Sequence, residues 1–324
     1  MSLSIRIAGV GVYVPKQAVS AADLDARLGV APGTTLAQNG VAMRYFAHED
    51  ETASFMGAAA IERALLQSSL DVSCLDAILF SGVMSEQPMP STAILIHQRL
   101  GARAQGTACF DINASCAGFL RGMEMAAAGI QSGIWKRVAV VSVELSSKGL
   151  RWSDFDTCTL FGDGAAAAVF EASNDASAIL AIRSETLSQG ADLCQMRAGG
   201  SRFNVRTPPP EFDDYLFAMK GRPLLRLVQQ NFPRFLGELL AETPVQLVIP
   251  HQASAVGLAF LRKELAPHGL PAIEILPSFG NQVSASIPFA LHHAIASGAL
   301  KRGDTALLVG TAAGVTMNGI VFRY

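Results

Sequence analysis

Three residues that lie far apart in the sequence, Cys116, His251 and Asn281, have the side-chain types needed to form and use a thioester. Cys116 follows a predicted strand over 108–112 and opens a predicted helix. Its sulfur is therefore expected at the positive end of the helix dipole, which favours the thiolate. A thiolate attacks a thioester carbonyl, and the product is another thioester that a second reactant can attack. A cysteine among alanines and glycines is also a common small core residue, so Cys116 taken alone leaves both interpretations open.

His251 and Asn281 are two neutral hydrogen-bond donors. His251 follows an apolar run that is typical of a strand, and Asn281 follows Gly280, a residue suited to an unusual backbone angle. Each side chain can hydrogen-bond a carbonyl oxygen that gains negative charge, as an enolate requires. Considered singly, a histidine at a strand end is usually structural and an asparagine after glycine is usually a turn residue. Their interpretation as site residues depends on their lying beside Cys116.

The sequence around Cys116 recurs in the second half of the chain. Each copy has a polar turn, a predicted helix that ends in Ser-Gly, a Lys-Arg pair and a buried strand. Ser132 and Ser297 close the two helices and are 165 residues apart, as are Cys116 and Asn281. This spacing predicts that the cysteine and the asparagine occupy equivalent places in two related units, whose strand ends would meet at one shared site.

The secondary-structure pattern predicts an α/β fold made of two similar halves. Residues 1–172 would carry the cysteine, and residues 173–324 would carry the histidine and the asparagine. Continuous apolar runs typical of buried strands occur at 5–10, 77–80, 138–143, 246–249 and 305–309. Ala- and Leu-rich stretches with helical spacing occur at 54–68, 117–132 and 287–297.

Composition narrows the class of function. The 324 residues are 50% hydrophobic, enough for a large core, and no apolar run reaches membrane-spanning length. A net charge of −2 argues against nucleic acid as the main partner. The N-terminus lacks the features of a secretory signal, which predicts a cytoplasmic protein. Five cysteines without CxxC spacing disfavour a disulfide framework or structural zinc, and the adjacent His292 and His293 point to different faces of a helix, so no metal site is expected.

Five motifs together give the sequence a specific resemblance. They are Asp111-Ile-Asn-Ala-Ser-Cys-Ala-Gly-Phe119, Leu160-Phe-Gly-Asp-Gly-Ala-Ala-Ala167, Pro250-His-Gln-Ala253, Gly280-Asn281 and the closing Gly314-Val-Thr-Met-Asn-Gly-Ile-Val-Phe-Arg-Tyr324. In this order they resemble 3-oxoacyl-[acyl-carrier-protein] synthase III of the thiolase superfamily, from the first strand to the last residue. The resemblance implies a duplicated five-layered αβαβα thiolase fold and a homodimer.

The resemblance also implies a reaction. Cys116 would accept an acyl group from a CoA or carrier-protein thioester, and the enolate formed by decarboxylation of a malonyl thioester would attack it, with no permanently bound cofactor. His251 and Asn281 would stabilise the enolate. The backbone N–H groups of Cys116 and Ala313 would form the oxyanion hole, although Ala313 stands where the family usually has glycine. Met89 corresponds to the residue that enters the partner subunit's acyl tunnel.

The sequence departs from the family where the adenine of CoA is usually held. Thr34, Gln38 and Phe155 stand where a tryptophan and two arginines are typical, and the nearby Arg151 and Trp152 are candidates to replace them. This favours a specialised relative over the usual initiator of fatty-acid synthesis. Basic residues that could receive an acyl carrier protein are Arg222, Arg226, Arg262 and Lys263.

Two alternatives stay open at this point. An acyltransferase of the same fold would pass the acyl group to an oxygen or nitrogen nucleophile, and a non-catalytic partner subunit would only shape a heterodimer. Glu86, close to Met89, could serve as a base in a reaction without decarboxylation, although a surface carboxylate is the simpler interpretation. Cys74, Cys109, Cys158 and Cys194 are expected to be small packing residues.

Overall fold

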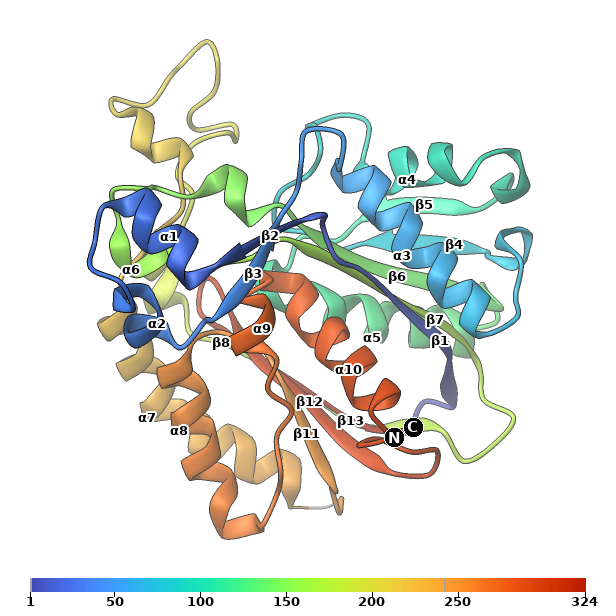
Figure 1. Ribbon diagram of the computed structural model, residues 1–324. Coiled ribbons are helices and arrows are strands. Elements are labelled where there is room, and N and C mark those ends of the chain that lie inside the picture. The colour runs from blue at the N-terminus through green and yellow to red at the C-terminus, as the bar shows by residue number, and fades with distance from the viewer. Residues whose placement is uncertain (1, 242) are drawn as a thin grey trace.

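The fold consists of two mixed sheets separated by a layer of helices, with a further layer of helices on each outer face (Figure 1). The computed structural model describes residues 2–241 and 243–324, with the side chain of Ala102 left out. Within these residues, no helix is both long and apolar enough to cross a membrane. The predicted α/β class and five-layered arrangement are confirmed.

The first sheet has five strands in the order β1-β7-β6-β4-β5. The continuous hydrophobic runs form these strands because both faces of the sheet are covered by helices. Their bounds are β1 Ile5–Tyr13, β4 Ala77–Phe80, β5 Ala108–Asp111, β6 Arg137–Glu144 and β7 Gly164–Ala172.

The second sheet repeats this arrangement with four strands in the order β8-β13-β12-β11. In each sheet the first three strands pair antiparallel and the next pair is parallel. A parallel bridge between Val248 and Ala272 stands where the first sheet has β5. The bounds are β8 Ala178–Thr186, β11 Leu247–Pro250, β12 Thr305–Ala312 and β13 Thr316–Arg323. The duplication inferred from the sequence is therefore present in the topology.

Three helical layers cover the four sheet faces. The central pair, α5 (Gly118–Gln131) and α10 (Ser286–Ala296), shares one apolar core with the inner faces of both sheets. The outer pair α3 (Ala53–Gln67) and α4 (Thr92–Leu100) packs on the first sheet. The other outer pair, α7 (Gly221–Leu240) and α8 (Ala255–Leu265), packs on the second.

Smaller elements gather at the end of the sheets where β4, β6, β11 and β12 finish. Figure 1 shows α1, α2, α6 and α9 together on this side, beside the starts of α7 and α8. Their bounds are β2 Gln17–Ser20, α1 Ala21–Leu28, α2 Thr34–Asn39, β3 Met43–Phe46, α6 Phe155–Cys158, β9 Cys194–Gln195, β10 Ala218–Met219 and α9 Leu276–Phe279. The segment between β9 and β10 includes three consecutive prolines at 208–210 and projects away from the layers (Figure 1).

Candidate active site

Cys116 lies in a short 3-10 turn, Ser115–Ala117, between β5 and α5. This turn packs against β12 of the second sheet and against a matching 3-10 turn, Val283–Ala285. Ala313 comes directly after β12, and its backbone N–H and that of Cys116 itself act to lower the pKa of the Cys116 thiol. The cysteine of the first half therefore meets the end of a strand of the second half.

Burial raises the pKa of the Cys116 thiol well above its usual range. The neighbouring Cys194 and Glu144 raise this pKa further, whereas the two backbone N–H groups lower it. The resting side chain is therefore a thiol. The sequence predicts that the helix dipole favours a thiolate at Cys116. In the structure burial acts against this effect, and α5 begins only at Gly118, two residues after the cysteine.

Glu144 is a buried acid beside Cys116 that the sequence analysis missed. It ends β6, and its carboxylate accepts hydrogen bonds from the backbone N–H of Val83 at 3.0 Å and from the backbone and hydroxyl of Ser284. Burial raises the pKa of Glu144 to about 7, although these hydrogen bonds lower it. The side chain thus joins the first half to the turn after Asn281. A carboxylate that ends a fully apolar run such as 138–143 was the available signal in the sequence.

His251 continues directly from β11, and its backbone N–H donates to the carbonyl of Val309 at 2.8 Å. The residue is 7% exposed, and burial lowers its pKa to about 4, so the imidazole is neutral near pH 7. Within the described part of the chain, its Nδ1 has no hydrogen-bond partner. A neutral imidazole can donate one N–H to a substrate oxygen.

The turn after His251 is fixed by the buried side chain of Gln252. Its Nε2 donates to the carbonyl oxygens of Pro250 and Ile273 at 2.9 and 3.1 Å. Its Oε1 accepts from the backbone N–H groups of Ile275 and Leu276 at 2.9 and 3.1 Å. All the polar atoms of this side chain are used, so the turn that carries His251 is held in one conformation.

Asn281 is oriented by bonds on both sides of its amide. Its Nδ2 donates to the carbonyl of Ala253 at 3.0 Å, and its Oδ1 accepts from the backbone N–H of Val283 at 2.8 Å. A primary amide has two N–H groups, so one remains for a ligand. Because Ala253 is two residues after His251, the first bond ties the asparagine to the histidine turn.

The glycines beside Asn281 are required by close backbone packing. The backbone of Asn281 pairs with Leu160 and Gly162 of the first half, at 3.0 and 3.1 Å. A Cβ on Gly280, which has φ +68°, would approach the carbonyl oxygen of Leu160 to 2.8 Å, and one on Gly162 would approach that of Phe279 to 2.2 Å. The predicted unusual backbone angle at Gly280 is confirmed, and it positions Asn281 across the junction of the two halves.

The predicted equivalence of Cys116 and Asn281 needs correction. The two helices end alike, with Ser132 and Ser297 as C-caps. Their beginnings differ, because α5 has 14 residues and α10 has 11. Ser115 and Val283, with φ +49° and +47°, each open the 3-10 turn before the helix. Counted from these turns, Cys116 corresponds to Ser284 rather than to Asn281.

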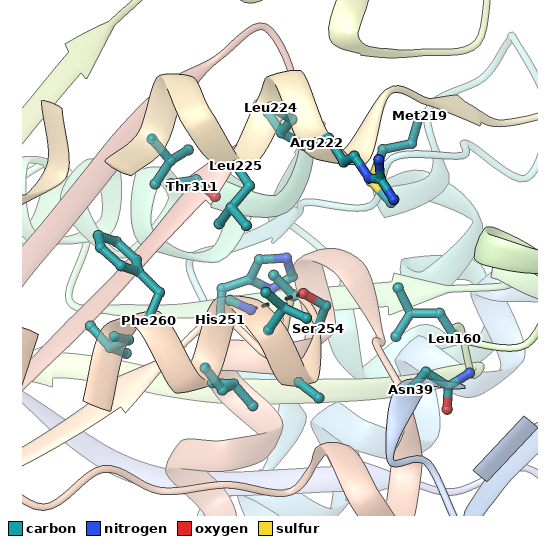
Figure 2. A pocket seen from close by; sticks show the side chains of 18 of the residues that line it. Asn39, Leu160, Met219, Arg222, Leu224, Leu225, His251, Ser254, Phe260 and Thr311 are labelled. Carbon is teal, nitrogen blue, oxygen red and sulfur yellow. Dashed lines mark hydrogen bonds between the residues drawn. The ribbon is translucent and has the colours of Figure 1, made fainter. Parts of the chain in front are cut away.

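A cavity of about 630 Å³ opens beside His251 (Figure 2). Apolar side chains at the starts of α7 and α8, among them Leu225 and Phe260, form its walls, and His251 and Ser254 lie in its middle part. Cys116 and Asn281 are not among the lining residues. They adjoin the cavity through Ala253, the acceptor of Asn281, and through the end of β12 next to Ala313.

The other residues that were predicted to contact the substrate differ in whether they line the cavity. Met89 is 84% exposed, and Glu86, although exposed, accepts a hydrogen bond from the backbone N–H of Ser54 at the start of α3. Gln38 lines the cavity and donates to Asp156 at 2.7 Å. Thr34, Phe155, Arg151 and Trp152 do not line it.

The four basic residues predicted to receive a carrier protein are not equivalent. Arg222 lies at the start of α7 and lines the cavity (Figure 2). Arg226 is exposed on the same helix one turn later. Arg262 and Lys263 lie in the last turn of α8, and Arg262 forms an ion pair with Glu274.

Comparisons with known proteins agree with this fold. The family description "3-Oxoacyl-[acyl-carrier-protein (ACP)] synthase III" matches residues 110–195, and its C-terminal description matches residues 239–324. The beta-ketoacyl-[acyl-carrier-protein] synthase III of Aquifex aeolicus is 32% identical, covering 99% of this chain and 100% of the relative.

Two solved structures have the same fold over nearly the whole chain. The crystal structure of 3-oxoacyl-[acyl-carrier-protein] synthase III from Aquifex aeolicus has a TM-score of 0.86 at 32% identity, covering 99% of this chain and 100% of that one. The priming beta-ketosynthase from the R1128 polyketide biosynthetic pathway has a TM-score of 0.89 at 26% identity, covering 99% and 97%. The chain belongs to the 3-oxoacyl-[acyl-carrier-protein] synthase III family, condensing enzymes of the acyltransferase type with the thiolase fold.

Proposed function

We propose that this enzyme transfers an acyl group from a thioester donor to Cys116 and then condenses it with a malonyl-type thioester. The observation that carries the proposal is the junction of the two halves, where the Cys116 turn packs on β12, the strand that leads directly to Ala313. The packing brings a nucleophile and a backbone donor together at the inner side of the cavity that His251 lines. These are the parts that acyl transfer requires.

In the first step the Cys116 sulfur attacks the donor's thioester carbonyl. The donor's carbon–sulfur bond breaks, and the donor leaves as a free thiol that carries away the proton originally on Cys116. Because burial favours the neutral thiol, this proton is lost during the attack rather than before it. Negative charge on the carbonyl oxygen would be stabilised by the backbone N–H groups of Cys116 and Ala313. Because the donor is a backbone group, the alanine at position 313 can supply it as a glycine would.

In the second step a malonyl-type thioester loses carbon dioxide and becomes an enolate. The neutral imidazole of His251 and the free N–H of Asn281 would donate to the enolate oxygen. The enolate carbon attacks the acyl carbonyl, the bond to the Cys116 sulfur breaks, and a β-ketoacyl thioester leaves. Protonation restores the thiol.

The proposal includes the partners. The relatives' names include an acyl carrier protein, and Arg222, Arg226 and Lys263 offer positive charge on α7 and α8 for such an acidic partner. Arg262 is a weaker candidate because Glu274 neutralises it. We further propose a cytoplasmic homodimer in which the exposed Met89 enters the partner subunit's acyl tunnel. The division of the chain at residues 172 and 173, between β7 and β8, is retained as a proposal.

The acyl unit or pathway is proposed to be specialised. The supporting observation lies at the mouth of the cavity, the end next to α6. There Gln38, which stands where the family usually has an arginine, bonds to Asp156. Substrates would be CoA or phosphopantetheine thioesters, and no bound cofactor is required for the two steps above.

Intact-protein mass spectrometry tests the acyl-enzyme. The protein is offered a panel of acyl-CoA and acyl-carrier donors, then a malonyl thioester. We expect the mass of one acyl group on the native chain but not on Cys116→Ala, and release of carbon dioxide with loss of that mass after malonyl addition. An enzyme that stays unmodified with every donor contradicts the proposal.

The alternative transfer to an oxygen or nitrogen acceptor keeps the same acyl-enzyme and differs in the second step. It predicts an ester or amide product without carbon dioxide. Glu86 does not favour this alternative, because its carboxylate bonds to the start of α3.

A further inference from the structure

Of the described residues that line the cavity, the aromatic ones are Phe232 and Phe260, which lie within α7 and α8 rather than beside α6. Trp152, the nearest candidate in the sequence, does not line the cavity. One face of its ring is covered by the Arg27 guanidinium, 3.5 Å from the ring centroid, and Phe46 packs edge-on at 6.2 Å. Trp152 is therefore packed against Arg27 and Phe46 rather than placed at the cavity.

Arg151 is equally unavailable. Its guanidinium forms an ion pair with the Asp213 carboxylate at 3.2 Å and donates to the Asp213 carbonyl at 3.1 Å. These contacts hold it against the projecting segment between β9 and β10. It therefore offers no free cation to a phosphate at the cavity.

The residues that do line the mouth near α6 are acidic. Asp154 and Asp156 both line the cavity, and Asp154 caps α6 by accepting from the backbone N–H of Asp156 at 3.2 Å. Gln38 of α2 bonds across to Asp156 at 2.7 Å. CoA carries a pyrophosphate and a 3′-phosphate, so these two carboxylates would repel its nucleotide end.

Positive charge at the mouth comes from the start of α7. Lys220 and Arg222 line the cavity, and neither has an acidic partner within salt-bridge distance among the residues that the structure describes. Figure 2 shows Arg222 beside Met219. The N-terminus of this 20-residue helix, which has no side-chain cap, adds to the positive potential. Together these groups suit the single phosphate of a phosphopantetheine arm.

We propose that the mouth selects acyl donors that carry phosphopantetheine without the CoA nucleotide, with Asp154 and Asp156 acting as the residues that disfavour the nucleotide. The inference rests on the proposed function and specifies its donor. The shared chemistry is a phosphopantetheine thioester, whether it is attached to a carrier protein or free.

Calorimetric binding tests the selection independently of acyl transfer. CoA and free 4′-phosphopantetheine are titrated into the full chain with Cys116→Ala. We expect CoA to bind no more tightly than phosphopantetheine. The double variant Asp154→Asn with Asp156→Asn should shift the affinity ratio toward CoA by about tenfold or less, the range of a few partly exposed charge contacts. Asparagine can cap α6 and accept from Gln38, so the variant keeps the local structure.

The matched control replaces two carboxylates that do not line the cavity, Glu49→Gln with Glu62→Gln, and should leave the ratio unchanged. A native chain that binds CoA at least tenfold more tightly than phosphopantetheine overturns the proposal, as does a double variant with an unchanged ratio.

Acylation of native Cys116 by the same acyl group on CoA, free phosphopantetheine and carrier protein then distinguishes the sources of the arm. A faster rate from the carrier than from the free arm indicates additional protein contacts, and equal rates indicate that the arm alone is recognised. Either result supports the selection if CoA is the slowest donor. Failure of all three donors contradicts the proposed function, while the calorimetric ratio still decides the donor proposal.

Discussion

At the residue scale, the environment of His251 matches its proposed role as a neutral hydrogen-bond donor to the enolate oxygen. The side chain is neutral because burial lowers its pKa to about 4, and its backbone is fixed by β11 and β12. We expect His251→Ala to lower the condensation rate by about 10² to 10³, the usual cost of losing one donor to a developing oxyanion. Single-turnover product formation from pre-acylated protein measures it. His268→Ala, an exposed histidine, is the control, and equal rates for both variants would contradict the role.

The raised pKa of Cys116 gives a second prediction at this scale. Because burial favours the thiol, alkylation of Cys116 by iodoacetamide should be slow at pH 7 and should keep rising to pH 9.5 without a plateau. Peptide mass spectrometry with Cys116→Ser as the blank assigns the modified residue. A rate that levels off below pH 8 would instead indicate a stable thiolate.

At the element scale, the position of His251 depends on the neighbouring strand. A Cβ on Gly310 of β12 would lie 2.6 Å from the His251 Cβ. Gly310→Ala should therefore displace the imidazole, cost about 1–3 kcal/mol through overpacking, and reduce condensation by about tenfold or more. Thermal denaturation and single-turnover rates measure both effects. Gly237→Ala in α7, where nothing lies within 4 Å, is the control and should keep its activity; a Gly310→Ala enzyme with normal turnover would refute the argument.

The elements that could be predicted from the sequence are those whose signal is local. The buried strands and the helices α3, α5 and α10 match the predicted segments within a few residues. A strand covered by helices on both faces needs apolar residues throughout, so the sequence marks it directly. The strands β9 and β10, of two residues each, gave no such signal. The position equivalent to Cys116 was misassigned because helix ends were aligned, whereas the two helices differ in length and correspond at their 3-10 turns.

At the scale of the whole molecule, the internal repeat was sufficient to predict two sheets that face a shared helical layer. It could not predict which groups meet across the junction of the halves. The bond between Glu144 and Ser284, and the proximity of Cys194 to Cys116, arise only when the halves pack together. Cys194 is therefore more than a small packing residue of its own loop. Site chemistry that spans two units has no signature within either unit.

The same junction predicts how the stability of the molecule changes with pH. The folded pKa of Glu144, about 7, lies above its ordinary value of 4.5. Its contribution to stability is thus fully present below pH 4.5 and is lost as the pH rises through 7. Glutamine stays neutral, so the stability of Glu144→Gln relative to the native chain should increase between pH 5.5 and 8.5, by about 2 kcal/mol.

Asp163, whose pKa burial raises to about 6, also titrates in this range, and His251, whose pKa is lowered to about 4 in the folded chain, titrates in it when unfolded. Both variants share these groups, so the difference between them reports Glu144 together with its coupling to Asp163. Urea denaturation at several pH values measures it, and the exposed Glu62→Gln should show a difference that does not depend on pH. If Glu144→Gln behaved like that control, the carboxylate would be ionised throughout this pH range in the folded protein, with a pKa no higher than its ordinary value. The buried contact between the halves would then be a charged hydrogen bond at neutral pH.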